Sequence, residues 1–122
     1  MVLPFTHHQN LQQFQQALID LQQQTVLTEL SPVQLRKSVQ TLQTLFQQQL
    51  SPLLAEEVTG EDAPRVSSIL TEIHKQLQLL AMDVTFLQVS RQSATGQQRL
   101  TQMRDRLSTL LRYCQILLGA EC

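Results

Sequence analysis

The chain has 122 residues, of which 42% are hydrophobic and 16% are charged, and its net charge is -1 at pH 7. A chain of this length usually forms one domain with one core, so we expect residues 1–122 to make a single domain. The nearly balanced charge gives no general attraction to nucleic acid or to an anionic membrane.

The sequence also bears on the compartment. No stretch approaches the ~20 consecutive apolar residues that a membrane-spanning helix needs. The first residues, MVLPFTHH, lack the basic region followed by an apolar run that marks a secretion signal. Cys114 lies on an apolar stripe and Cys122 is the last residue, which suggests neither a disulfide framework nor a metal site. We therefore expect a soluble, unprocessed, cytoplasmic protein without membrane contact.

The first predicted helix covers residues 6–24. Thr6 can cap it with its hydroxyl, and Gln9 can reach back to the Thr6 amide. β-Branched residues, Thr25 and Val26, weaken helix propensity after residue 24. The apolar positions step by three and four residues, which predicts one buried face: Leu11, Phe14, Leu18 and Leu21, with Ala17 alongside.

The second predicted helix covers residues 32–50. Ser31 stands at the cap position, Pro32 at the first helical position and Gln34 at the third, which is a strong start signal. Pro52 cannot donate a backbone hydrogen bond, so the helix should end or kink near residue 50. The predicted core face is Leu35, Val39, Leu42, Phe46 and Leu50, with Leu45 beside them.

The third predicted helix covers residues 64–90 and follows a connection, residues 56–64, that holds four acids, one glycine and one proline. It contains the most apolar stretch of the chain, LQLLAMDVTFLQV, from Leu77 to Val89. Steps of about three and four residues exclude a strand and predict an inward stripe. This stripe is Val66, Leu70, Ile73, Leu77, Leu80, Val84 and Leu87.

The same helix carries a second apolar series. Because an α-helix rotates by about 100° per residue, this series lies on a different side of the helix from the first. Its members are Leu79, Met82, Phe86 and Val89. A helix that is apolar on most of its circumference is normally buried against several neighbours, so we expect this helix to be the central one. Either the Leu53-Leu54 segment or a neighbouring helix covers the second series, or the series is an exposed patch for self-association or partner binding.

Asp83 is the one acid inside this apolar stretch, and by angle it lies between the two stripes. One interpretation is a boundary residue that forms a salt bridge with an arginine of another helix. The other is a polar contact inside a partner interface. The candidate interface is therefore Leu79, Met82, Asp83, Phe86 and Val89.

The fourth predicted helix covers residues 96–118. Thr95 with Gln98 offers a capping box, and Gly119 is a natural C-terminal stop. The inward stripe is Leu100, Met103, Leu107, Leu110, Cys114 and Leu117, widened by Leu111 and Leu118. Four amphipathic helices with mostly short connections predict an all-α fold, an antiparallel four-helix bundle whose long, highly apolar third helix is central.

The sequence offers no signature of catalysis or of cofactor binding. A di-iron bundle needs inward-facing glutamate and histidine, with Glu-x-x-His pairs, and none occurs. His7 and His8 point about 100° apart on a helix, and His74 has no neighbouring nucleophile in the sequence. Cys114 lies on the core stripe, where we expect a small buried hydrophobe. We therefore expect no enzyme activity, no catalytic residue, no cofactor and no metal.

Arginines concentrate near the C-terminal end of the chain. Around the fourth helix, Arg99 and Arg106 flank one side of the core stripe, Arg104 flanks the other, and Arg112 points away. No single basic ridge forms, and there is no short recognition helix after a tight turn. The pattern does not favour nucleic-acid binding.

Two stretches of the chain resemble a known family. The first is LQTLFQQQLSPLL, from Leu42 to Leu54, and the second runs from Glu72 to Leu118 and includes LQLLAMDVTFLQ, SRQSAT and RYCQ. They resemble the PatD family, the cyanobacterial heterocyst frequency control proteins. The resemblance implies a small helical cytoplasmic regulator of heterocyst frequency and cell division, which acts by binding the tubulin-like protein FtsZ.

Residue chemistry and the resemblance both predict a non-enzymatic helical interaction protein. A protein partner is expected, with FtsZ the candidate and a homodimer possible in addition. The competing classes are a helical adaptor or structural protein of another pathway, a nucleic-acid-associated regulator and an enzyme, in falling order.

Overall fold

The computed structural model describes residues 5–26, 31–51, 63–90 and 94–119. Every regular element in these ranges is a helix, so the predicted all-α class is confirmed. The elements are α1 (Phe5–Gln24), α2 (Pro32–Leu45), the π-helical turn η1 (Phe46–Leu50), α4 (Ala63–Ser90) and α5 (Ala94–Leu118). These bounds compare with predicted ranges of 6–24, 32–50, 64–90 and 96–118.

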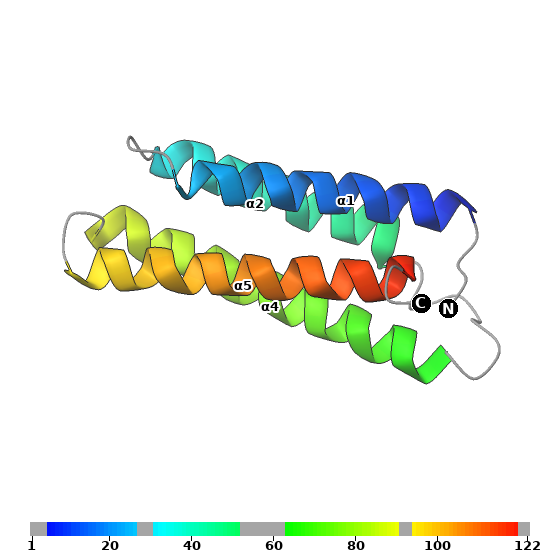
Figure 1. Cartoon of the computed structure of the whole chain (residues 1–122). Coiled ribbons are helices and arrows are strands. Elements are labelled where there is room, and N and C mark those ends of the chain that lie inside the picture. The colour runs from blue at the N-terminus through cyan, green and yellow to red at the C-terminus, as the bar shows by residue number, and fades with distance from the viewer. Residues whose placement is uncertain (1–4, 27–30, 52–62, 91–93, 120–122) are drawn as a thin grey trace.

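The helices lie side by side, and the chain direction reverses from each helix to the next (Figure 1). α4 packs most extensively against α5, α2 packs against α4, and α1 contacts both α5 and α2. Each helix in the described part of the chain thus has two main neighbours, and the core lies between all of them.

The predicted inward stripes of all the helices are buried, which confirms the core that the helical spacing predicts. α1 contributes Leu11, Phe14, Leu18 and Leu21, and α2 with η1 contributes Leu35, Val39, Leu42, Phe46 and Leu50. α4 contributes Val66, Leu70, Ile73, Leu77, Leu80, Val84 and Leu87, together with Ile69, which the pattern did not single out. α5 contributes Leu100, Met103, Leu107, Leu110, Cys114 and Leu117.

The second helix ends differently from the plain α-helix that the sequence predicts. Its last turn, η1, is π-helical, and the Ser51 amide donates to the Phe46 carbonyl oxygen over 2.6 Å, five residues back. A wider turn rotates the chain less per residue, so Phe46 and Leu50 both stay on the buried side. The predicted end near residue 50 agrees with the end of η1.

The start of α2 has the predicted cap. Ser31 is in an extended conformation, and its hydroxyl oxygen accepts a hydrogen bond from the Gln34 amide over 3.3 Å. α1 begins at Phe5 and α5 at Ala94, one residue before Thr6 and Thr95, so the structure does not place either threonine at the cap position predicted for it.

Two side-chain hydrogen bonds connect the C-terminal end of α1 to α2 and α5. The Gln24 side-chain amide donates to the Ser38 hydroxyl of α2 over 2.9 Å. Arg104 of α5 donates through Nη2 to the carbonyl oxygen of buried Thr25 over 2.6 Å. These contacts hold the end of α1 against both α2 and α5.

The structure does not distinguish α4 as a central helix. It packs chiefly against α2 and α5, so it has no more main neighbours than the other helices have. Its inward stripe is buried, but Met82 and Phe86 on its second stripe are exposed. Among the described residues α2 and α5 are the main neighbours of α4, and Met82 and Phe86 stay about half exposed although Arg99 of α5 contacts the Phe86 ring, so burial of α4 on most of its sides is not confirmed.

Candidate protein-binding face

The second apolar stripe of α4 is open to solvent at its middle. Met82 is 53% exposed and Phe86 is 45% exposed, while Leu79 is half-buried. The Val89 side chain and the Leu53-Leu54 segment lie outside the described residues. We call Met82 and Phe86 the α4 face. They are one helical turn apart, so their side chains are neighbours on the helix surface.

Asp83 lies beside this face but is not part of the surface, because only 1% of it is exposed. Its Oδ1 accepts from Arg99 Nη1 over 3.2 Å, and its Oδ2 accepts from Arg106 Nε over 2.5 Å. Both arginines belong to α5, so the predicted salt bridge to another helix is confirmed. Asp83 is more deeply buried than a boundary residue, since two guanidinium groups enclose the carboxylate.

Arg99 joins the buried ion pair to the α4 face. Its guanidinium carbon lies 4.3 Å from the centre of the Phe86 ring, within the range of a cation–π contact. The same Nη1 that bonds Asp83 also lies 3.4 Å from Gln102 Oε1. The helical spacing places Arg99 and Arg106 on one flank of α5 but does not predict the contact with Phe86, which depends on how α4 and α5 are aligned.

A polar hollow lies next to this cluster, between α4 and α5. It is open to solvent, has a volume of about 320 Å³, and is lined by Gln76, Gln102, Asp105, Arg106 and Thr109. Asp105 is exposed, so a negative charge lies near Arg106 at this end of the cluster. The hollow has polar walls and no enclosed apolar floor, unlike a typical small-molecule site.

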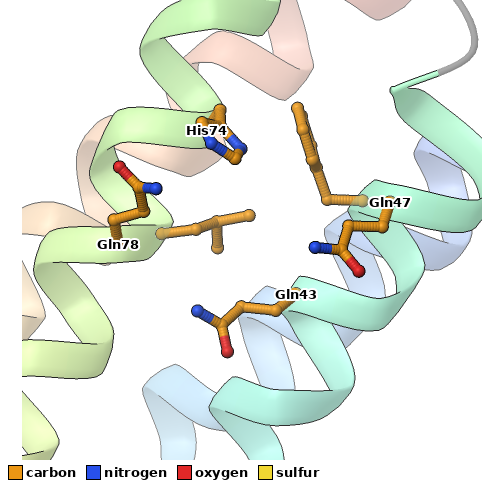
Figure 2. A pocket seen from close by; sticks show the side chains of 6 residues that line it. Gln43, Gln47, His74 and Gln78 are labelled. Atoms are coloured by element: carbon orange, nitrogen blue, oxygen red, sulfur yellow. The ribbon is translucent and has the colours of Figure 1, made fainter.

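A smaller groove lies between α2 and α4 (Figure 2). The His74 and Phe46 rings line it with their centres 5.4 Å apart, and the volume is about 90 Å³. Leu77 and the side chains of three glutamines complete the lining, namely Gln43, Gln47 and Gln78. None of the lining residues is a nucleophile, and His74 is exposed, as expected for a solvated histidine.

Cys114 is fully buried on the inward stripe of α5. Burial raises the pKa of the Cys114 thiol from 9.0 to about 12. The thiol is therefore protonated at neutral pH, whereas a nucleophilic cysteine needs an electropositive and partly open setting.

The arginines of α5 are used in different ways. Arg99 and Arg106 bind Asp83, Arg104 binds the Thr25 carbonyl group, and Arg112 is exposed. Arg91 lies outside the described residues. Within the described ranges, no three side chains of histidine, cysteine, aspartate or glutamate come together as metal ligands would. None of the helices described combines the length and apolar content needed to cross a bilayer.

Comparisons of the chain with protein-family models, with curated proteins and with solved structures find no match.

Proposed function

We propose that this chain is a non-enzymatic helical protein that acts by binding another protein through the α4 face. The observation that carries the proposal is the exposure of Met82 and Phe86 on a helix whose other apolar stripe is fully buried. The inward stripe of the same helix already supplies a continuous buried face. Large apolar side chains that remain exposed together commonly mark a partner site.

Met82 and Phe86 are suited to the centre of a small interface. Aromatic residues and methionine are enriched at protein–protein interfaces, and an aromatic ring buries a large area with few rotatable bonds. Arg99 holds the Phe86 ring from one side, which restricts its movement before a partner arrives. A restrained side chain loses less conformational entropy on binding.

The candidate partner is FtsZ, and the support for it is the resemblance of residues 42–54 and 72–118 to the PatD family. On this proposal the chain is a cytoplasmic regulator of cell division and of heterocyst frequency. The alternative is a helical adaptor of another pathway. A nucleic-acid-associated regulator is less favoured, because the arginines of α5 lie on different sides of the helix and form no single basic ridge.

The architecture that we propose with this function is an antiparallel four-helix bundle within a single domain. The reversal of chain direction in Figure 1 and the pairing of neighbouring helices support it. In such a bundle α4 supplies both an inward stripe and an outward face, which makes it the helix that links stability to binding.

The experiment is the double substitution of Met82→Gln and Phe86→Gln, measured by thermal melting, sedimentation and co-pelleting with FtsZ polymer. We expect unchanged melting and lost co-pelleting. Val33→Gln is the control, because Val33 is also an exposed apolar residue, at 57%, and belongs to another helix, α2. The control should melt and co-pellet like the unmodified protein.

Three outcomes would contradict the proposal. A large drop in stability would show that the α4 face belongs to the core. Unchanged association in a stable double mutant would remove this face from the interface, and absence of co-pelleting by the unmodified protein would reject FtsZ as the partner.

A further inference from the structure

We infer that the α4 face binds a short segment of a partner protein that carries a carboxylate beside an aliphatic side chain, and that Arg99 binds this carboxylate. The inference rests on the proposed function, since it specifies the partner chemistry of the same face.

The ion-pair cluster between α4 and α5 carries more positive than negative charge. One carboxylate, Asp83, faces two guanidinium groups, Arg99 and Arg106. Asp83 is buried, and each of its carboxylate oxygens accepts a hydrogen bond from one of these arginines. Its negative charge is therefore not exposed at the surface. The side chains of Arg99 and Arg106 remain 30% and 23% exposed, so the excess charge is accessible from solvent.

With Asp105 included the charges of the group balance overall, but they are unevenly placed, because Arg99 forms an ion pair with buried Asp83 alone and presents its exposed positive charge at one end. At the other end, Asp105 lines the same polar hollow as Arg106 and offsets its charge. Arg99 uses Nη1 for both Asp83 and Gln102, and its Nε and Nη2 make no hydrogen bond to the described residues. A guanidinium has five N–H donors in a planar fork that matches a carboxylate.

Arg99 is also held in position for this role. Asp83 binds it on one side and the Phe86 ring lies 4.3 Å from its guanidinium carbon. Met82 lies one helical turn from Phe86, so the apolar surface and the cation are adjacent. An aliphatic side chain on this apolar surface would place a neighbouring carboxylate at Arg99.

A second copy of this chain fits the face less well. The exposed parts of Met82 and Phe86 offer on the order of 200 Å² of apolar surface, whereas a stable interface needs about 800 Å² from each partner. A twofold dimer on this face would also bring the two copies of Arg99 towards each other. Like charges facing each other are unfavourable, whereas an acidic segment is complementary.

The first experiment uses two labelled peptides of alternating leucine and glutamate or alternating leucine and glutamine, with binding to the full chain followed by fluorescence anisotropy. We expect the glutamate peptide to bind about five- to tenfold more tightly, and high salt to remove the difference. Equal affinity for the two peptides would overturn the inference, and this test requires no variant.

The second experiment compares Arg99→Gln with Arg112→Gln, an exposed arginine on the same helix, in the peptide assay and in co-pelleting with FtsZ polymer. Arg106 still binds Asp83 in the Arg99→Gln protein, so we expect it to fold, and melting checks this. Arg99→Gln should lose the preference for glutamate and weaken co-pelleting about five- to tenfold, while Arg112→Gln should retain both.

The outcomes separate the inference from the proposed function. If Met82→Gln with Phe86→Gln abolishes co-pelleting but Arg99→Gln does not weaken it, the proposed function stands and the inference is wrong. If the unmodified protein does not co-pellet with FtsZ polymer but binds the glutamate peptide more tightly in a way that depends on Arg99, FtsZ is rejected as the partner and the inference stands. Concentration-dependent dimerisation that Phe86→Gln abolishes would assign the face to a second copy and overturn the inference.

Discussion

The two apolar stripes of α4 have similar composition but different surroundings. The stripe that contains Leu77, Leu80 and Val84 is buried between α2 and α5, while Met82 and Phe86 are about half exposed. Asp83 lies between them, enclosed by two arginines of α5. The comparison teaches that hydrophobicity defines where a helix can be buried, and that the neighbouring helices decide which of its apolar faces is buried.

The largest expected effect tests whether the two stripes differ in energy. Leu80→Ala and Leu107→Ala should each lower the free energy of unfolding by about 2–5 kcal/mol, because both remove buried methyl groups and leave a cavity. Met82→Gln should change it by less than about 0.5 kcal/mol. Urea denaturation measures all three. Losses under about 0.5 kcal/mol at both leucine positions would mean that the buried stripes are misassigned.

Asp83 lies between the two stripes, and its substitution tests whether its ion pairs with α5 stabilise the fold. Asp83→Asn should lower the free energy of unfolding by about 2 kcal/mol, less than a fully buried ion pair, because both arginines can turn towards water. Asp105→Asn, an exposed acid on α5, is the control and should have an effect within about 0.5 kcal/mol. Denaturant unfolding at neutral pH gives both values, and equal effects would argue against a role for Asp83 in joining α4 to α5.

Cys114 of α5 belongs to the buried core, and its burial should make the stability of the protein depend on pH. The pKa of the Cys114 thiol is about 12 in the folded protein, whereas the ordinary value of 9.0 applies to the unfolded chain. As pH rises above 9, the thiol therefore loses its proton in the unfolded chain before it does so in the folded protein. The native state then binds more protons, and stability falls as pH rises from 9 towards 12. At pH 10 the loss should be about 1 kcal/mol relative to pH 8.

Cys114→Ala is the control for this pH dependence. Other groups also titrate in alkali, so the quantity to compare is the fall in stability between pH 8 and pH 10 in the two proteins. The fall should be about 1 kcal/mol smaller in the variant. Identical falls would indicate that the thiol is in contact with water.

The smallest expected effect lies outside α4, at the caps. Ser31→Ala should destabilise by about 1 kcal/mol, because the hydroxyl of Ser31 satisfies the Gln34 amide, which has no partner within the helix. Thr95→Ala should have a smaller effect, since Ser93 offers a rival start for the last helix. Thermal melting ranks the two, and the reverse order would place the helix starts differently.

Most of the fold was predictable from local spacing. Steps of three and four residues identified the inward stripes of every helix, and the Ser31-Pro32 pair identified the start of α2, because these signals act within one or two turns of the chain. The same reasoning offered a salt bridge with an arginine as one of two interpretations of Asp83. It did not identify which arginines, because that depends on the axial alignment of α4 and α5.

The candidate site was only partly predictable for the same reason. The sequence placed Met82 and Phe86 on a second stripe, but their exposure depends on the positions of α2 and α5. The stacking of Arg99 on Phe86 joins residues of different helices and has no local signal. Burial of Asp83, which the sequence grouped with the surface residues, likewise follows from two side chains that reach across from α5.

The π-helical turn Phe46–Leu50 has a consequence for how chain length can vary in this protein. The inward positions Leu35, Val39, Leu42 and Phe46 follow steps of four, three and four, and a regular repeat would place the next one three residues on. Leu50 comes four residues on, so the chain holds one residue more than the repeat requires, and the wide turn accommodates it. Deletion of one of the three glutamines in this turn, residues 47–49, should therefore restore a continuous α-helix with the same buried side. This turn is a position at which evolution can add or remove a single residue without moving the last buried leucine off the core side of the helix.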